Sequence, residues 1–153
     1  VYEQRSAWTK SLIPDSNMEN TSMNDNRLEA FNAYRAKMNQ RILEEDGAHL
    51  GIKRFFNLDS AAYREGSLDS STKELLGLVA SMVLRCDDCI LYHMITCVES
   101  GYSKEEIQEA MNVALVVGGS IVIPHLRRAY ESMDELLDSR DATQCPEGRK
   151  WRF

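Results

Sequence analysis

Apolar residues recur at three- and four-residue steps over most of residues 70–137, which is the spacing of one face of an α-helix. Two stretches, Ser71 to Glu74 and Ser103 to Glu106, have the spacing of a capping box, which marks the first turn of a helix. No stretch alternates apolar and polar residues as a half-exposed strand would. The sequence therefore predicts an all-α fold, a bundle of about six to seven helices.

Glycines, capping residues and the apolar periodicity together place the helices along the chain. Pro14 lies in the polar lead-in, whereas Pro124 is expected in a first helical turn, where proline is tolerated. The expected helices are 26–46, a shorter one near 49–56 with one more turn at 61–64, one from Ser71 to about Leu84, one from about Cys86 to Gly101, one from Ser103 to Val117 and one from Ser120 to about Leu137.

Composition divides the chain into three parts: a polar N-terminal arm at 1–25, a helical domain at 26–138 and a polar C-terminal tail at 139–153. The arm is either a solvated terminus or a segment that crosses to a neighbouring subunit. Its apolar anchors in the second case would be Trp8, Leu12 and Ile13.

A net charge of -6 argues against binding to nucleic acid or to an anionic membrane. No apolar run approaches the roughly 20 residues of a membrane span. Three of the four cysteines fall within residues 86–97, and only Cys145 lies in the tail. This clustering favours a thiol site over a disulfide scaffold, and a reactive dithiol suits the reducing cytoplasm.

Cys86, Cys89 and His93 are spaced to share one face of a helix. An imidazole one turn from a thiol can take its proton and so favour the nucleophilic thiolate. Cys89, one turn before His93, is the candidate for attack. Cys86 is the candidate resolving residue and is expected to have the more accessible sulfur.

Glu74 is the expected carboxylate partner of His93. Twelve residues of continuous helix would hold Glu74 and Cys86 about 18 Å apart. If the chain instead turns near Leu84 to Cys86, Glu74 and His93 lie on neighbouring helices and can converge, as a carboxylate and an imidazole do in catalytic triads. The alternative is that Glu74 only completes the capping box with Ser71.

Two further interpretations stay open for the same residues. The cysteines could be core residues, with His93 a satisfied interior histidine. Alternatively, Cys86, Cys89, His93 and His125 could bind zinc, although the chain lacks the usual second pair of ligands. His125 and Asp88 are possible additional site residues. Cys97 is expected in the core, and His49 is expected to be structural.

The pattern from Glu74 through Cys86 and Cys89 to His93 resembles that of alkylhydroperoxidase D (AhpD), and the resemblance extends over roughly 50–137. Gly101 to Ile107 and Gly118 to His125 add to the likeness to the carboxymuconolactone decarboxylase/AhpD-like superfamily. AhpD itself has a histidine where this chain has Asp88.

The resemblance implies an AhpD-like helical bundle that assembles as a homo-oligomer, a trimer or a hexamer. It implies a peroxidase or disulfide oxidoreductase of antioxidant type, with Cys86 and Cys89 as the redox pair and Glu74 and His93 as the proton relay. The substrate would be a hydroperoxide or a disulfide, and the electron donor a lipoyl-bearing or thioredoxin-like protein. No bound cofactor or metal is expected. The lactone decarboxylase branch generally lacks the dithiol.

Three functions are therefore compared. The first is the thiol-dependent redox enzyme. The second is a cofactor-free decarboxylase or other acid–base enzyme on a small carboxylated substrate, in which Glu74 and His93, with His125, transfer protons and the dithiol is incidental. The third is a non-enzymatic module whose disulfide changes its assembly.

Overall fold

The computed structural model describes residues 20–45 and 47–144. Six α-helices and one 3-10 turn make up this part of the chain, and it contains no strand, which confirms the all-α prediction. Trp8, Leu12, Ile13 and Cys145 lie outside the described residues. The elements are α1 (Asn20–Leu43), α2 (Leu50–Ala62), α3 (Ser70–Leu84), α4 (Asp87–Glu99), α5 (Lys104–Gly118), η2 (Ser120–Val122) and α6 (Ile123–Gln144).

The chain divides into two compact units. The first unit, Val1–His49, contains α1, and the second unit, Leu50–Phe153, contains α2 to α6.

Two helix ends differ from the prediction. The first helix begins at Asn20, six residues before the predicted start at Asn26, so part of the predicted arm is helical. The last helix continues to Gln144, beyond the predicted end near Leu137. Among the described helices, none is long and apolar enough to cross a membrane.

A single helix, α2, replaces the short helix and extra turn that the sequence predicted. None of its residues is buried. Its largest exposed apolar side chains are Leu50, Ile52, Phe55 and Leu58. Isolated helices of this length are marginal in water, so α2 needs a surface to cover its apolar side chains.

The start of α3 differs from the prediction in a way that matters for the site. Asp69, not Ser71, is the N-cap, and its carboxylate accepts hydrogen bonds from the Ser71 hydroxyl and the Thr72 backbone N–H, both at 2.6 Å. Hydrogen bonds from Ser71 and then Thr72 lower the pKa of Asp69 to about 2. A carboxylate caps a helix as well as a hydroxyl does, and here it leaves Glu74 free for another partner.

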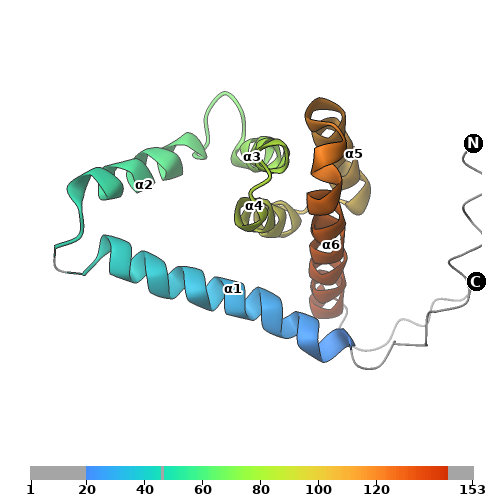
Figure 1. The fold of residues 1–153 in the computed structure, drawn as a ribbon, viewed down its shortest axis with the longest axis horizontal. Helices are drawn as coiled ribbons and strands as arrows, with labels where there is room; N and C mark the ends of the chain where they lie inside the picture. Colours follow the sequence, from blue (N-terminus) through green and yellow to red (C-terminus); the bar gives the residue numbers. More distant parts are fainter. Residues whose placement is uncertain (1–19, 46, 145–153) are drawn as a thin grey trace, which may run out of the picture. The chain divides into compact units, whose positions relative to one another are not determined.

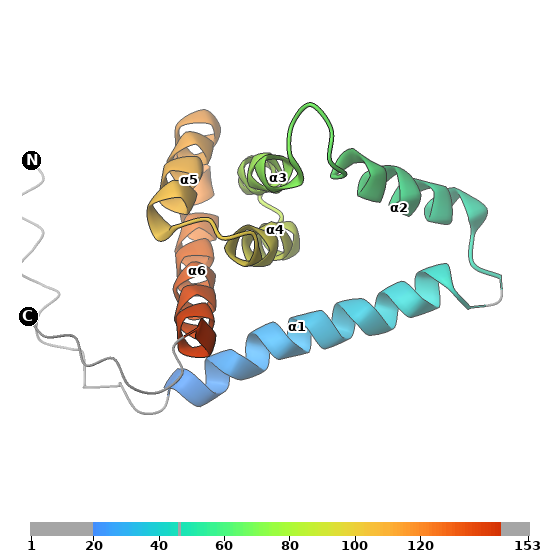
Figure 2. The ribbon, with the colours of Figure 1, turned by 180° about the vertical axis from the view of Figure 1, so that it is seen from behind.

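The chain turns sharply between α3 and α4. Arg85 caps the end of α3 in the left-handed conformation (φ 61°), and Cys86 caps the start of α4. The prediction of a turn near Leu84 to Cys86 is therefore confirmed. As a result α3 and α4 lie side by side (Figures 1 and 2). Side chains 19 residues apart in the sequence can thus meet across the two helices.

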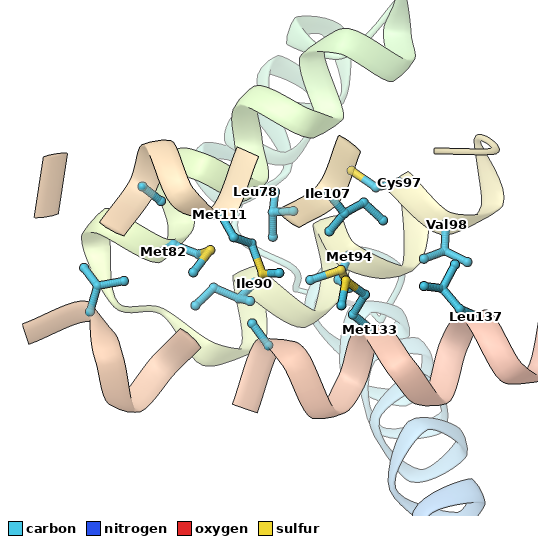
Figure 3. Close-up of a cluster of buried hydrophobic side chains, with 13 residues drawn as sticks. Leu78, Met82, Ile90, Met94, Cys97, Val98, Ile107, Met111, Met133 and Leu137 are labelled. Carbon is cyan, nitrogen blue, oxygen red and sulfur yellow. The ribbon is translucent and has the colours of Figure 1, made fainter. Parts of the chain in front are cut away.

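The core lies between α3, α4, α5 and α6. Apolar side chains from all four helices interlock there, with methionines at the centre (Figure 3). Ser103 and Glu106 form the predicted capping box at the start of α5. The fully buried large side chains are Leu78, Met82, Met94, Cys97, Ile107, Met111, Val122 and Met133. Burial of this kind, at about 25 cal/mol per Å² of apolar surface, holds α3 and α4 at the spacing that the site requires.

Candidate active site

Cys86 and Cys89 are joined as a disulfide at the N-terminus of α4, with their Cα atoms 5.3 Å apart. Cys86 is the N-cap and Cys89 is in the first turn. The positive end of the helix dipole lies at this position and stabilises a thiolate there. The helix dipole at this position favours a thiolate, whereas the carboxylates of Asp87 and Asp88 in the same turn oppose one.

The exposure of the two cysteines is the reverse of the sequence expectation. Cys89 is exposed, whereas Cys86 is only half-exposed. The reason is local: the backbone N–H of Cys86 donates to the Ser81 carbonyl, which holds Cys86 against the end of α3. Cys89 projects from the first turn of α4, so it is the residue that a reactant in solution meets first.

Glu74 and His93 meet across α3 and α4, as the sequence predicted for a chain that turns between them. The Nδ1 of His93 lies 2.7 Å from Oε2 of Glu74, and both side chains are more than nine-tenths buried. A carboxylate only accepts, so Nδ1–H donates and the lone pair of Nε2 is left to accept a proton. The capping interpretation of Glu74 is wrong, because its carboxylate binds His93 instead of the start of α3.

Three neighbours of His93 were not predicted from the sequence. Gly77 lies under the imidazole so closely that a Cβ there would be 2.6 Å from Cε1. The Tyr63 hydroxyl is 3.5 Å from Nε2, and the Tyr92 ring meets the imidazole edge-on at 5.1 Å. Burial, followed by the negative charge of Asp59 and Glu74, raises the pKa of Tyr63 above its ordinary value, so this hydroxyl keeps its proton.

His125 joins a different cluster, at the N-terminus of α4. Its Nδ1 is 2.7 Å from Oδ1 of Asp87, and Arg128 is 2.9 Å from Oδ2 of the same carboxylate. Burial opposes ionisation of Asp87, but hydrogen bonds from His125 and Arg128 outweigh it and lower its pKa. The sequence analysis named Asp88 as a possible additional site residue, but His125 contacts the preceding residue, Asp87.

The zinc interpretation is not supported by these positions. Within residues 20–45 and 47–144, no three His, Cys, Asp or Glu side chains lie where they could hold a metal ion. Cys86 and Cys89 are bonded to each other, His93 binds Glu74, and His125 binds Asp87. The donors proposed for zinc thus have other partners.

Cys97 is a core residue, as predicted. It is a free thiol with no exposed surface. Burial, with a contribution from the charge of Glu74, raises the pKa of Cys97 to about 12. A thiol with such a pKa stays protonated and unreactive near neutral pH. The core interpretation therefore holds for Cys97 but not for exposed Cys89.

A model of the carboxymuconolactone decarboxylase family matches residues 52–132, a span that starts in α2 and ends in α6 and includes every residue of the site described above. The chain belongs to the carboxymuconolactone decarboxylase family. This membership agrees with the AhpD-like superfamily suggested by the Glu74 to His93 pattern.

Solved structures of family members have the same fold. A carboxymuconolactone decarboxylase family protein from Thermotoga maritima, described with a suggested role in the antioxidative response, is 55% identical and superposes with a TM-score of 0.70. The match covers 76% of this chain and 97% of that one. A family protein from Legionella pneumophila, crystallised in its apo form, is 25% identical with a TM-score of 0.61, covering 73% and 98% of the two chains.

A further relative is similar over a shorter span. It is protein 4 in the cox locus of Paracoccus denitrificans, which is 29% identical over 82 residues. These cover 54% of this chain and 74% of that protein.

Proposed function

We propose that this chain is a thiol-dependent peroxidase or disulfide oxidoreductase that cycles between a Cys86–Cys89 disulfide and a dithiol. The observation that carries the proposal is the position of the pair: it lies at a helix N-terminus, one turn from an imidazole that a buried carboxylate orients. The substrate class is a hydroperoxide or a disulfide.

In the oxidative half-reaction, His93 accepts the proton of the Cys89 thiol, and the charge of Glu74 stabilises the imidazolium that forms. The Cys89 thiolate attacks a peroxide oxygen, the O–O bond breaks, and the alkoxide leaves with a proton as the alcohol. Cys89 becomes a sulfenic acid. The Cys86 thiolate then attacks the Cys89 sulfur, the S–S bond forms, and water leaves.

In the reductive half-reaction, a dithiol donor supplies two electrons and two protons. Its thiolate attacks one sulfur of the pair, and the other sulfur leaves as a thiolate that takes up a proton. The second donor thiol resolves the mixed disulfide, releasing the oxidised donor. A lipoyl-bearing or thioredoxin-like protein in a reducing compartment, the cytoplasm, fits this requirement, and the residues described need no bound cofactor for it.

The test is intact mass and thiol alkylation of the reduced protein before and after one equivalent of hydroperoxide, with peptide mapping. We expect loss of two alkylatable thiols, a mapped Cys86–Cys89 disulfide, and recovery with dihydrolipoamide. Cys89→Ser should abolish turnover, whereas Cys86→Ser should stop after a single equivalent with Cys89 as the sulfenic acid. Thiols that stay free after peroxide treatment would overturn the proposal.

The acid–base alternative rests on the Glu74–His93 pair, because this pair can transfer protons without either sulfur. The two functions separate in the double variant Cys86→Ser/Cys89→Ser. Only the redox function predicts complete loss of activity. Retained decarboxylation of a small carboxylated lactone by the double variant would favour the alternative.

We also propose that the chain forms a homo-oligomer, a trimer or a hexamer, in which a second copy covers the apolar side chains of α2. The support is that α2 buries no residue and exposes Phe55 and Leu58 by about two thirds each. Phe55→Lys should lower the mass measured by light scattering. Asn57→Lys adds the same charge to an exposed polar position of α2 and is the control. A Phe55→Lys protein of unchanged mass would refute this interface.

The non-enzymatic alternative predicts that assembly depends on the disulfide. The same mass measurement in reducing and in oxidising buffer tests it. Equal masses in the two buffers would exclude that function and leave the enzyme.

A further inference from the structure

Asp87, His125 and Arg128 form a second polar cluster that the proposed chemistry does not use. Asp87 follows Cys86 directly, in the first turn of α4, while His125 and Arg128 lie in the first two turns of α6. The three contacts within the cluster are 2.7 Å for His125–Asp87, 2.9 Å for Arg128–Asp87 and 3.1 Å for Arg128–His125. The cluster thus ties α6 to the residue beside the half-buried sulfur.

The proton positions in the cluster follow from the donor inventory. Arginine only donates and a carboxylate only accepts. Two acceptors 2.7 Å apart would repel, so a proton lies between His125 Nδ1 and Asp87, and the imidazole is the donor. Arg128 and His125 then each donate to one oxygen of Asp87. The close Arg128–His125 distance results from two donors meeting one carboxylate.

The charge of Asp87 matters because of what it adjoins. Cys86 gains thiolate stability from the N-terminus of α4, and an unbalanced carboxylate in the next residue would oppose that gain. Arg85 and Asp88 also flank this part of the chain, but the charged group that pairs with Asp87 is Arg128. Pairing leaves the local charge near zero and fixes the carboxylate in one place.

We propose that Arg128 and His125 are positioning residues that hold Asp87 and cancel its charge, so that Cys86 departs readily as a thiolate when the disulfide is reduced. This inference rests on the proposed redox function. A donor thiolate meets exposed Cys89 first and forms a bond to its sulfur; the electron pair of the broken S–S bond then goes to Cys86, which later takes a proton. Leaving-group thiols of lower pKa depart faster.

Two substitutions test the proposal because they break the same contact and change the charge in opposite directions. Arg128→Met leaves the charge of Asp87 unbalanced, whereas Asp87→Asn leaves Arg128 unbalanced. We expect the thiolate fraction of Cys86 at fixed pH to fall about three- to tenfold in the first variant and to rise by a similar factor in the second. The double variant should return close to the parent.

The measurement is the pH dependence of iodoacetamide alkylation at Cys86, mapped by peptide mass, in a Cys89→Ser background. The rate of disulfide reduction by dithiothreitol, in the chain with both cysteines, should change in the same directions. Lys104→Met breaks a matched exposed ion pair, Lys104–Asp134 at 2.7 Å, which does not involve the cysteine pair. We expect no change from it in either measurement.

The outcomes separate this inference from the proposed function. If Arg128→Met and Asp87→Asn shift the alkylation profile in the same direction, or not at all, the cluster has only a structural role and the inference is wrong. The alkylation profile does not require peroxide turnover. Loss of peroxide-driven disulfide formation in the parent chain would therefore refute the redox function while leaving the charge effect measurable.

Discussion

Two carboxylate–imidazole pairs flank the disulfide, and they differ mainly in burial. In the inner pair, Glu74–His93, the side chains are 7% and 9% exposed. In the outer pair, Asp87–His125, they are 46% and 17% exposed, and an arginine joins them. Both pairs have a 2.7 Å contact through Nδ1. The same bond length thus occurs in two very different dielectric surroundings.

Burial changes what such a pair can do. Inside the protein the attraction between carboxylate and imidazole is little screened, so the inner pair can bind a transferred proton and hold it. Near solvent, water and salt weaken the attraction, and the outer pair is suited to placing charge. The comparison assigns proton transfer to the inner pair and charge balance to the outer pair.

Replacing each carboxylate by its amide should show this difference most strongly. Glu74→Gln removes the charge that stabilises the His93 imidazolium, so peroxide-driven disulfide formation should slow by about 100- to 10,000-fold. Asp87→Asn should change it by less than about tenfold. Stopped-flow measurement with limiting peroxide compares them directly. Equal losses in the two variants would remove the distinction between the pairs.

Packing beneath the inner pair is the next point of difference. A Cβ at Gly77 would lie 2.6 Å from the His93 ring, and buried His93 has little room to move away. We expect Gly77→Ala to destabilise the fold by about 1–3 kcal/mol and to displace His93 from Glu74. Urea unfolding and the alkylation rate of Cys89 measure the two effects.

Gly66→Ala is the matched control for Gly77→Ala. A Cβ at Gly66 would lie 3.5 Å from the Nζ of Lys73 and 4.0 Å from the Leu68 carbonyl oxygen, both ordinary van der Waals contacts. Its stability should stay close to that of the parent. A Gly77→Ala protein that is as stable and as active as the Gly66→Ala protein would mean that the inner pair tolerates movement.

The sequence predicted the inner pair because its signal is local. Capping residues and apolar periodicity locate α3 and α4, and the aspartates after Cys86 favour a new helix start. A turn between the two helices would then let Glu74 and His93 converge, although the sequence left the capping role of Glu74 open. The same argument predicted the wrong N-cap. Ser71 completes a capping-box pattern, but Asp69 is one of the preferred cap residues as well and takes the position.

The outer pair and the neighbours of His93 could not be predicted in this way. Asp87 and His125 are 38 residues apart and Tyr63 and His93 are 30 apart, so their contacts depend on how whole helices pack. Gly77 offered a weak signal, because a glycine within an apolar helix often marks a close approach. The sequence analysis expected Cys86, not Cys89, to have the more accessible sulfur. That expectation was wrong because periodicity alone does not show which turn of α4 the other helices cover.

Cys97 provides a probe of the inner charge. The Glu74 carboxylate adds to burial in raising the pKa of this thiol to about 12. Glu74→Gln should therefore lower the Cys97 pKa and speed its alkylation at pH 9 by about three- to tenfold, whereas Asp87→Asn should not. Both rates are best measured in a Cys86→Ser/Cys89→Ser background. No response to Glu74→Gln would indicate that burial alone sets this pKa.

The same shift makes a prediction about alkaline pH. The pKa of Cys97 is higher in the folded protein, about 12, than its ordinary value of 9.0, so folding favours the protonated thiol. The resulting stability is fully present below about pH 9 and is lost as the pH rises toward 12. Cys97→Ala should unfold with a weaker dependence on pH in that range. An unchanged pH dependence would mean that other groups control alkaline unfolding.

The smallest expected effect is on the stability that the outer cluster contributes. Exposed ion pairs are typically worth less than about 1 kcal/mol, because water already solvates both partners. Arg128→Met should therefore change the free energy of unfolding by less than that amount, and Lys104→Met by a similar amount. High salt should reduce both differences further. If Arg128→Met instead costs several kcal/mol in urea unfolding, the outer cluster is a structural brace between α4 and α6, and its effect on Cys86 must be reinterpreted as a consequence of that brace.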